Sequence, residues 1–204
     1  MSETRQLEQA ISFEEYLEGE QLAEQKHELV AGRVYAMAGA TAAHNRLSLN
    51  AASLLDSHLD GSPCTPFVAD MKLRVRLGAD DHVYYPDVFV TCDPSDDHEL
   101  YKERPDTIIE VLSNSTESTD RREKLGAYTQ IPSLNNYLLV AQKVMEVTLY
   151  RRETGWRAEV FTKPEEQVPL KSLDFSLSLE KLYRRIVFPN IDPLTGIETY
   201  PELT

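Results

Sequence analysis

The chain lacks long apolar segments and has few cysteines, and each shortage bears on the class of protein. No window of its 204 residues approaches the roughly 20 apolar residues of a membrane-spanning helix. Residues 1–15 are polar and acidic, unlike a signal or transit peptide, so we expect a cytoplasmic protein without a membrane partner. Cys64 and Cys92 show no metal-ligand spacing, which suits a reducing compartment, although a single disulfide is compatible with them.

Positive charge is also scarce, with 21 Lys and Arg against 34 Asp and Glu and a net charge of −13. This balance opposes binding of nucleic acid by the whole surface. A local basic surface is still compatible with it, because Lys72, Arg74 and Arg76 recur at the two-residue period of one strand face. Lys72 and Arg74 are therefore candidate nucleic-acid contacts, and solvated surface is the simpler interpretation. Glycine-rich phosphate loops are absent, which argues against kinases and nucleotide-binding folds.

The pattern of apolar residues predicts one domain over residues 1–188, followed by an irregular tail at 189–204. The expected elements, in chain order, are a helix from Ser12 to Gln25, a hairpin over Lys26–Ala38, a helix from Thr41 to Leu59, strands at Phe67–Leu77, His82–Thr91 and Thr107–Leu112, a helix from Thr119 to Gln130, strands at Tyr137–Val140, Val144–Tyr150 and Trp156–Thr162, and a helix at Leu177–Ile186. This order predicts an α/β or α+β fold, with a mixed sheet flanked by helices, an N-terminal hairpin and extra C-terminal strands.

Two carboxylates stand in apolar strands, where they are costly. Asp87 opens the run Val88-Phe89-Val90, and Glu110 lies inside Ile108–Leu112. An unpaired buried carboxylate costs several kcal/mol, so it must be neutralised by a base, by hydrogen bonds or by a metal ion. Two on neighbouring strands repel each other unless a cation lies between them. We therefore predict that Asp87 and Glu110 hold a hard divalent ion, Mg²⁺ or Mn²⁺, in a metal-dependent hydrolase.

Further groups near these strands could complete such a site. The main-chain carbonyl of Val111 is a candidate third oxygen ligand. Lys124 follows on the next helix and is the candidate for helping the attacking water or the developing charge. Asp120, Lys124 and Tyr128 share one face of that helix, at positions i, i+4 and i+8.

These segments together resemble the PD-(D/E)XK nuclease superfamily and, within it, the Uma-two family of restriction-endonuclease-like proteins. The resemblance covers about residues 26–141, the expected core, and is carried by HELVAGRVYAM, DMKLRV, YYPDVFV, IIEVLSNST, DRREK, Tyr128 and YLLV, in that order. The dipeptide PD alone is weak evidence for the family, because it is common in proteins. The succession of PD, EVLS-x-ST and D-x3-K-x3-Y, in that order, is strong evidence for it. Leu112 stands where the superfamily has lysine, and the resemblance implies that Lys124 takes that role.

The resemblance also implies function and further site residues. It implies a restriction-endonuclease-like fold that hydrolyses DNA with Mg²⁺ or Mn²⁺ and leaves a 5′-phosphate. Glu28 would be an accessory acid, and His44 and Ser113 auxiliary ligands or orienting groups. Because cutting both strands of a duplex usually takes two active sites, the resemblance also implies a homodimer.

Each candidate also has a simpler structural interpretation. Asp87 could cap a turn after Pro86, and Glu110 could form a buried ion pair with Lys124 or Arg74. Lys124 could form only a surface pair with Asp120. Glu28 could be an exposed hairpin residue, and His44 a core or capping histidine. Asp70 could simply project from a strand face, and Tyr128 could be a packed tyrosine with a satisfied hydroxyl. Ser113 has no His and Asp arrangement that would make it a nucleophile. A catalytically silent nuclease fold that binds nucleic acid or protein, and a hydrolase of RNA or small phosphoesters, are the competing functions.

Overall fold

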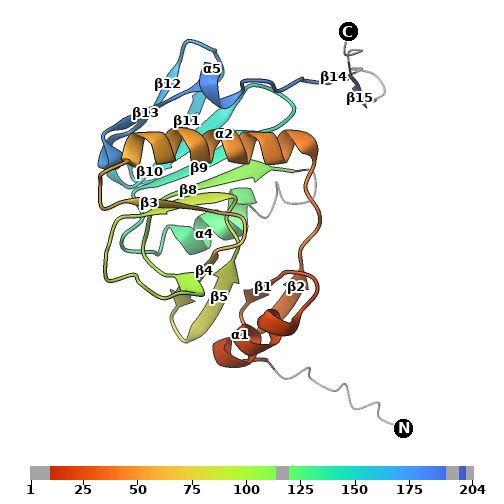
Figure 1. The fold of residues 1–204 in the computed structure, drawn as a ribbon, viewed down its shortest axis with the longest axis vertical. Coiled ribbons are helices and arrows are strands. Elements are labelled where there is room, and N and C mark those ends of the chain that lie inside the picture. Colours follow the sequence, from red (N-terminus) through yellow and green to blue (C-terminus); the bar gives the residue numbers. More distant parts are fainter. Residues whose placement is uncertain (1–9, 114–119, 192–197, 201–204) are drawn as a thin grey trace.

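The computed structural model describes residues 10–113, 120–191 and 198–200 (Figure 1). Its helices are α1 (Phe13–Leu22), α2 (Ala42–Leu59), α4 (Leu125–Tyr128) and α5 (Leu179–Leu182), with a π-helical turn η1 (Asp120–Lys124) and 3₁₀ turns η2 (Arg152–Thr154) and η3 (Lys171–Leu173). A five-stranded sheet has the order β2 (Arg33–Ala36), β1 (His27–Val30), β5 (Asp80–Tyr84), β4 (Lys72–Leu77), β7 (Tyr101–Lys102). A six-stranded sheet has the order β11 (Ala158–Phe161), β10 (Val147–Arg151), β9 (Asn136–Ala141), β8 (Pro105–Leu112), β6 (Val88–Thr91), β3 (Thr65–Val68). Two short hairpins, β12 (Gln167–Leu170) with β13 (Phe175–Ser178) and β14 (Asn190–Ile191) with β15 (Glu198–Thr199), complete this mixed α/β fold.

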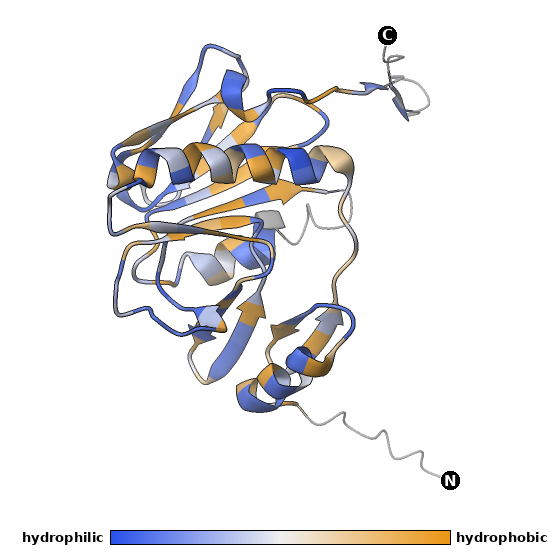
Figure 2. Ribbon diagram, viewed as in Figure 1, coloured by the Kyte–Doolittle hydropathy of each residue, from blue (hydrophilic) through white to orange (hydrophobic). Residues whose placement is uncertain are grey.

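Strand β8 lies at the centre of the core, and all eight of its residues are buried. It pairs antiparallel with β6 and parallel with β9. Because side chains alternate along a strand, Ile109 and Val111 join the cluster with α2, whereas Ile108 and Leu112 join the cluster with α4. Helix α2 crosses one face of the sheet (Figure 1), and hydrophobic residues are concentrated in the sheet strands (Figure 2). Glu110 alternates with Ile109 and Val111, which places it on the α4 side.

The N-terminal elements match the sequence predictions closely. Ser12 and Glu15 form a reciprocal capping box at α1, and Thr41 caps α2 by accepting from the backbone N–H of His44. Helix α1 ends at Leu22, earlier than predicted. The β1–β2 hairpin turns through Gly32 with φ +77°, where an added Cβ would lie 2.5 Å from Cβ of Ala10. Glycine is therefore required at this turn.

Two predicted strands are each divided between different sheets. The predicted strand Phe67–Leu77 is β3 and β4, separated by a turn in which Ala69 has φ +37°. The predicted strand His82–Thr91 is β5 and β6, interrupted at residues 85–87. Pro86 has no N–H to donate to a ladder, which explains the interruption. The break is functionally relevant because Asp87 lies in it.

The predicted C-terminal helix Leu177–Ile186 is wrong over its first part. Residues 175–178 form β13, and α5 is only the short helix Leu179–Leu182. Phe175 and Leu177 alternate with serines, which is the two-residue strand period that the sequence interpretation missed. Of the predicted helix Thr119–Gln130, Thr119 lies outside the described residues, and the described part is η1 followed by α4.

The acidic loop between β6 and β8 is ordered by two opposite charges. The Asp96 carboxylate accepts hydrogen bonds from the backbone N–H groups of Glu103 and Arg104. The Lys102 ammonium, in a residue only 8% exposed, donates to the carbonyl oxygens of Asp96 and His98 at 2.9 Å each. Side chains of the loop therefore satisfy several of its own backbone groups. Over the residues that are described, no helix combines the length and the apolar character needed to cross a membrane.

Cys64 and Cys92, left open by the sequence, form a disulfide that joins the start of β3 to the end of β6. Its closed loop spans 28 residues of sequence separation. Reduction is therefore expected to lower the free energy of unfolding by about 3 kcal/mol, through a less constrained unfolded chain. Denaturant unfolding with and without reductant measures this. The double variant Cys64→Ser/Cys92→Ser should be insensitive to reductant, and two free thiols in the untreated protein would contradict the prediction.

Candidate active site

Asp87 and Glu110 lie side by side at the ends of neighbouring strands. The β6–β8 ladder pairs Val88 with Ile109, so the next step along both strands sets Asp87 opposite Glu110. Oδ2 of Asp87 accepts from the backbone N–H of Val111 at 2.7 Å. In return, the backbone N–H of Asp87 faces Oε2 of Glu110 at 3.4 Å. Each carboxylate is thus oriented by the main chain of the other strand.

Lys124 lies between two carboxylates rather than on the surface. Its ammonium is 3.1 Å from Oε1 of Glu110 and 3.2 Å from Oε1 of Glu28, which comes from β1. Lys124 is 5% exposed, so the interpretation of it as a surface residue is wrong. The side chain of Asp120, its predicted partner, lies outside the described residues. The helix after β8 therefore brings a buried cation to the strand carboxylates, as the sequence pattern predicts.

Two buried tyrosines enclose the Glu110–Lys124 pair. Tyr128 donates its hydroxyl to Oε1 of Glu110 at 2.9 Å, and the Tyr84 ring centre lies 5.6 Å from the Lys124 ammonium. Burial, followed by the charge of Glu110, raises the pKa of Tyr128 well above its usual value. Burial also raises the pKa of Tyr84. Both hydroxyls therefore stay protonated at neutral pH, and Tyr128 acts as a fixed donor to Glu110.

Helix α2 brings His44 to the other carboxylate. Nε2 of His44 is 3.2 Å from Oδ2 of Asp87. The cap residue Thr41 donates its hydroxyl to Oε1 of Gln142 at 2.6 Å, and the Gln142 amide donates to the carbonyl oxygen of Leu112 at 2.8 Å. Gln142 thus links the start of α2 to the end of β8. The sequence interpretation missed it, although a polar amide directly after the buried strand β9 was the available signal.

The other predicted site residues lie elsewhere or outside this cluster. Arg74 does not partner Glu110, because its guanidinium binds Asp81 at 2.7 Å and lies 3.5 Å from Glu103. Asp70 projects into solvent and pairs with Lys26. Ser113 directly follows β8 and is partly buried. The cluster at this end of the sheet is defined by Asp87, Glu110, Lys124, Glu28, His44 and Tyr128, and we refer to it as the carboxylate site.

The donor set of the carboxylate site fits a hard divalent cation. Across the described ranges, no group of three or more His, Cys, Asp and Glu side chains forms a closed metal cluster. Mg²⁺ needs less than that, since one or two carboxylates and water molecules complete its shell. Oδ1 of Asp87 accepts no hydrogen bond from any described residue. Because Lys124 faces more than one carboxylate, an additional cation would also offset excess negative charge.

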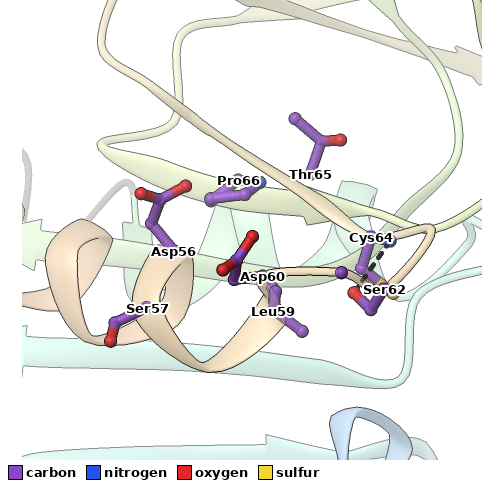
Figure 3. Close-up of a pocket in the computed structure, with 9 residues that line it drawn as sticks. Asp56, Ser57, Leu59, Asp60, Ser62, Cys64, Thr65 and Pro66 are labelled. Atoms are coloured by element: carbon purple, nitrogen blue, oxygen red, sulfur yellow. Dashed lines mark hydrogen bonds between the residues drawn. The ribbon is translucent and has the colours of Figure 1, made fainter.

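A separate pocket lies at the opposite end of α2. It has a volume of about 390 Å³, and its lining residues include Asp56, Asp60, Ser62 and Cys64 (Figure 3). The backbone N–H of Cys64 donates to the hydroxyl of Ser62. None of the predicted site residues lines it. An acidic side chain such as Asp56 is therefore a control for substitutions at the carboxylate site.

The mixed sheet, with this site at one end of its neighbouring strands β6 and β8, defines a restriction-endonuclease-like α/β protein. The chain belongs to the Uma2 (Uma-two) family, described as "Putative restriction endonuclease", whose family model matches residues 13–180. It is similar to the uncharacterized proteins slr1290 and sll1609 of Synechocystis sp. (strain ATCC 27184 / PCC 6803 / Kazusa). The first, slr1290, is 34% identical, and the match covers 87% of this chain and 94% of the relative. The second, sll1609, is 36% identical, and the match covers 70% of this chain and 81% of the relative.

A solved structure shares the fold. It is a crystal structure described as "a putative nuclease belonging to DUF820" from Anabaena variabilis ATCC 29413. Its TM-score is 0.65, and the match covers 79% of this chain and 91% of that chain. The identity is 20%, so the likeness establishes the fold and not the chemistry.

Proposed function

We propose that this protein is a Mg²⁺- or Mn²⁺-dependent endonuclease that hydrolyses phosphodiester bonds of DNA. The observation that carries the proposal is the reciprocal pairing of Asp87 with Glu110, with the Lys124 ammonium held against Glu110. Family membership supports the same chemistry. We propose a homodimer as well, because cutting a duplex usually takes two such sites.

The proposed roles follow from the contacts. Asp87, Glu110 and the carbonyl oxygen of Val111 would hold the ion, which supplies Lewis acidity to the phosphate and lowers the pKa of the attacking water. Lys124 orients that water and bears part of the charge that develops during in-line attack on phosphorus. Glu28 shares Lys124 as an accessory acid. The product would carry a 5′-phosphate.

Two further side chains position these groups. His44 holds Asp87 through Oδ2 and leaves Oδ1 for the ion. Tyr128 holds Glu110 through Oε1 and leaves Oε2 on the side of Asp87. Because these contacts already orient both carboxylates, each would meet a cation with little loss of side-chain freedom.

One observation favours a second candidate, a catalytically silent fold that binds nucleic acid or protein. The Lys124 ammonium lies 3.1 Å from Oε1 of Glu110, both residues are buried, and the pair can neutralise each other's charge. A buried ion pair of this kind is a sufficient structural use for both residues. RNA or a small phosphoester as the substrate would use the same carboxylates.

Removal of the metal separates the two candidates. The endonuclease should relax or linearise supercoiled plasmid with Mg²⁺ or Mn²⁺, and excess EDTA should stop it, because the carboxylates alone cannot polarise a phosphate. Calorimetry should show binding of the same ions to the protein without DNA. A protein that binds no Mg²⁺ or Mn²⁺ and cuts no plasmid would instead be the silent fold.

A further inference from the structure

Lys72, the first residue of β4, lies beside the carboxylate site. The β4–β5 ladder pairs Leu73 with Tyr84, so the next step sets Lys72 next to Tyr85, two residues before Asp87. The Lys72 ammonium is 5.2 Å from the centre of the Tyr85 ring. The backbone N–H of Tyr85 faces Oε1 of Glu28 at 3.5 Å, so this segment borders the site directly.

The Lys72 ammonium differs from the neighbouring cations Lys26 and Arg74 in having no ion pair with any residue that the structure describes. Among the residues that the structure describes, it makes no ion pair and no hydrogen bond. Lys26 pairs with Asp70, and Arg74 pairs with Asp81. Lys72 is also partly buried, and this burial lowers its pKa below the usual value despite the nearby charges of Glu20 and Asp70. A partly desolvated ammonium that forms no ion pair with a described residue is stabilised by an incoming anion.

The Tyr85 ring supports this cation rather than stacking on a base. Tyr85 is 4% exposed and its hydroxyl donates to Glu20 at 2.9 Å, which fixes the ring. A second ammonium, that of Lys26, lies 5.6 Å from the same ring centre. A buried ring beside two ammonium groups leaves no free face for a nucleobase, whereas the positive charge above it suits a phosphate.

We propose that Lys72 binds a backbone phosphate of the substrate strand next to the cleaved bond, with the Tyr85 ring as its platform. The inference rests on the proposed function and adds a substrate-binding residue to it. The contact is electrostatic and does not read sequence, so it sets affinity and the register of the strand. Arg74, although it recurs with Lys72 at the strand period, is excluded because its guanidinium is already bound.

The test is the salt dependence of DNA binding. Fluorescence anisotropy with a labelled duplex is measured in Ca²⁺, a hard cation that occupies carboxylate sites. Loss of one phosphate contact should lower the slope of log affinity against log salt by about 0.9. We therefore expect Lys72→Met, which keeps most of the apolar stem, to lower that slope and weaken binding equally for unrelated sequences. Lys181→Met, an exposed lysine on α5, should match the wild type.

The outcomes separate the two proposals. If the wild type binds and cuts DNA and Lys72→Met has an unchanged slope, the Lys72 assignment is overturned and the proposed function stands. If the wild type neither binds nor cuts DNA, the proposed function fails, and the phosphate contact with it. Under the expected result, plasmid cutting by Lys72→Met shows a raised KM with kcat retained, because Lys72 contacts a neighbouring phosphate rather than the reacting one.

Discussion

Asp87→Asn is expected to reduce plasmid cutting by about 10³-fold or more while leaving the fold intact. Asparagine keeps an oxygen that accepts from the backbone N–H of Val111, so the local geometry is retained. It removes the negative charge that the proposed ion requires. A metal that polarises a phosphate contributes several kcal/mol of transition-state stabilisation, and about 4 kcal/mol corresponds to that loss in rate. Initial rates of relaxation of supercoiled plasmid measure it.

Asp56→Asn is the matched control for this substitution. This substitution removes one negative charge, as Asp87→Asn does, but in the pocket at the far end of α2. The Asp56→Asn variant should therefore cut plasmid at the rate of the wild type. Calorimetry should show that Asp87→Asn loses binding of Mg²⁺ and that Asp56→Asn does not. Equal cutting by Asp87→Asn and wild type would remove Asp87 from the mechanism.

The sequence predicted the convergence at the carboxylate site because buried charges are costly. In the sequence Asp87 precedes an apolar run and Glu110 lies inside one, and the cost of burying a carboxylate indicated a partner or an ion. The family resemblance added Glu28 and His44, which arrive from a hairpin and from α2, and the structure brings both to the predicted carboxylates. Residues so far apart in the chain have no periodicity in common, so composition alone could not join them.

Other features were not predictable, because they depend on tertiary partners. Lys72 and Arg74 lie on the same strand face and carry the same charge, yet among the described residues Arg74 forms ion pairs with carboxylates and Lys72 does not. Cys64 and Cys92 pair only because β3 and β6 are neighbours in the sheet. In each case the sequence gives the residue type, and the strand order decides its contacts.

Lys124→Met tests whether the buried lysine serves structure, catalysis or both. The substitution leaves Glu110 and Glu28 without their shared cation, and breaking a buried pair costs about 3–5 kcal/mol of stability. Cutting should also be lost, which by itself would not distinguish a missing catalytic group from a damaged fold. Denaturant unfolding measures the first effect, and the plasmid assay measures the second.

The double variant Lys124→Met/Glu110→Gln separates the two roles. Neutralising Glu110 removes the more deeply buried of the two uncompensated charges, so stability should return toward that of the wild type, whereas cutting should stay absent. Mg²⁺ adds a second criterion. If the carboxylates form the proposed ion site, Lys124→Met has more uncompensated negative charge there than the wild type, and Mg²⁺ should raise its melting temperature by more. A shift that is equal in both proteins would mean that Lys124 and the ion do not share the same carboxylates. The purely structural interpretation of the Glu110–Lys124 pair would then be favoured, because an ion that binds Glu110 must respond to the loss of the cation 3.1 Å from its carboxylate.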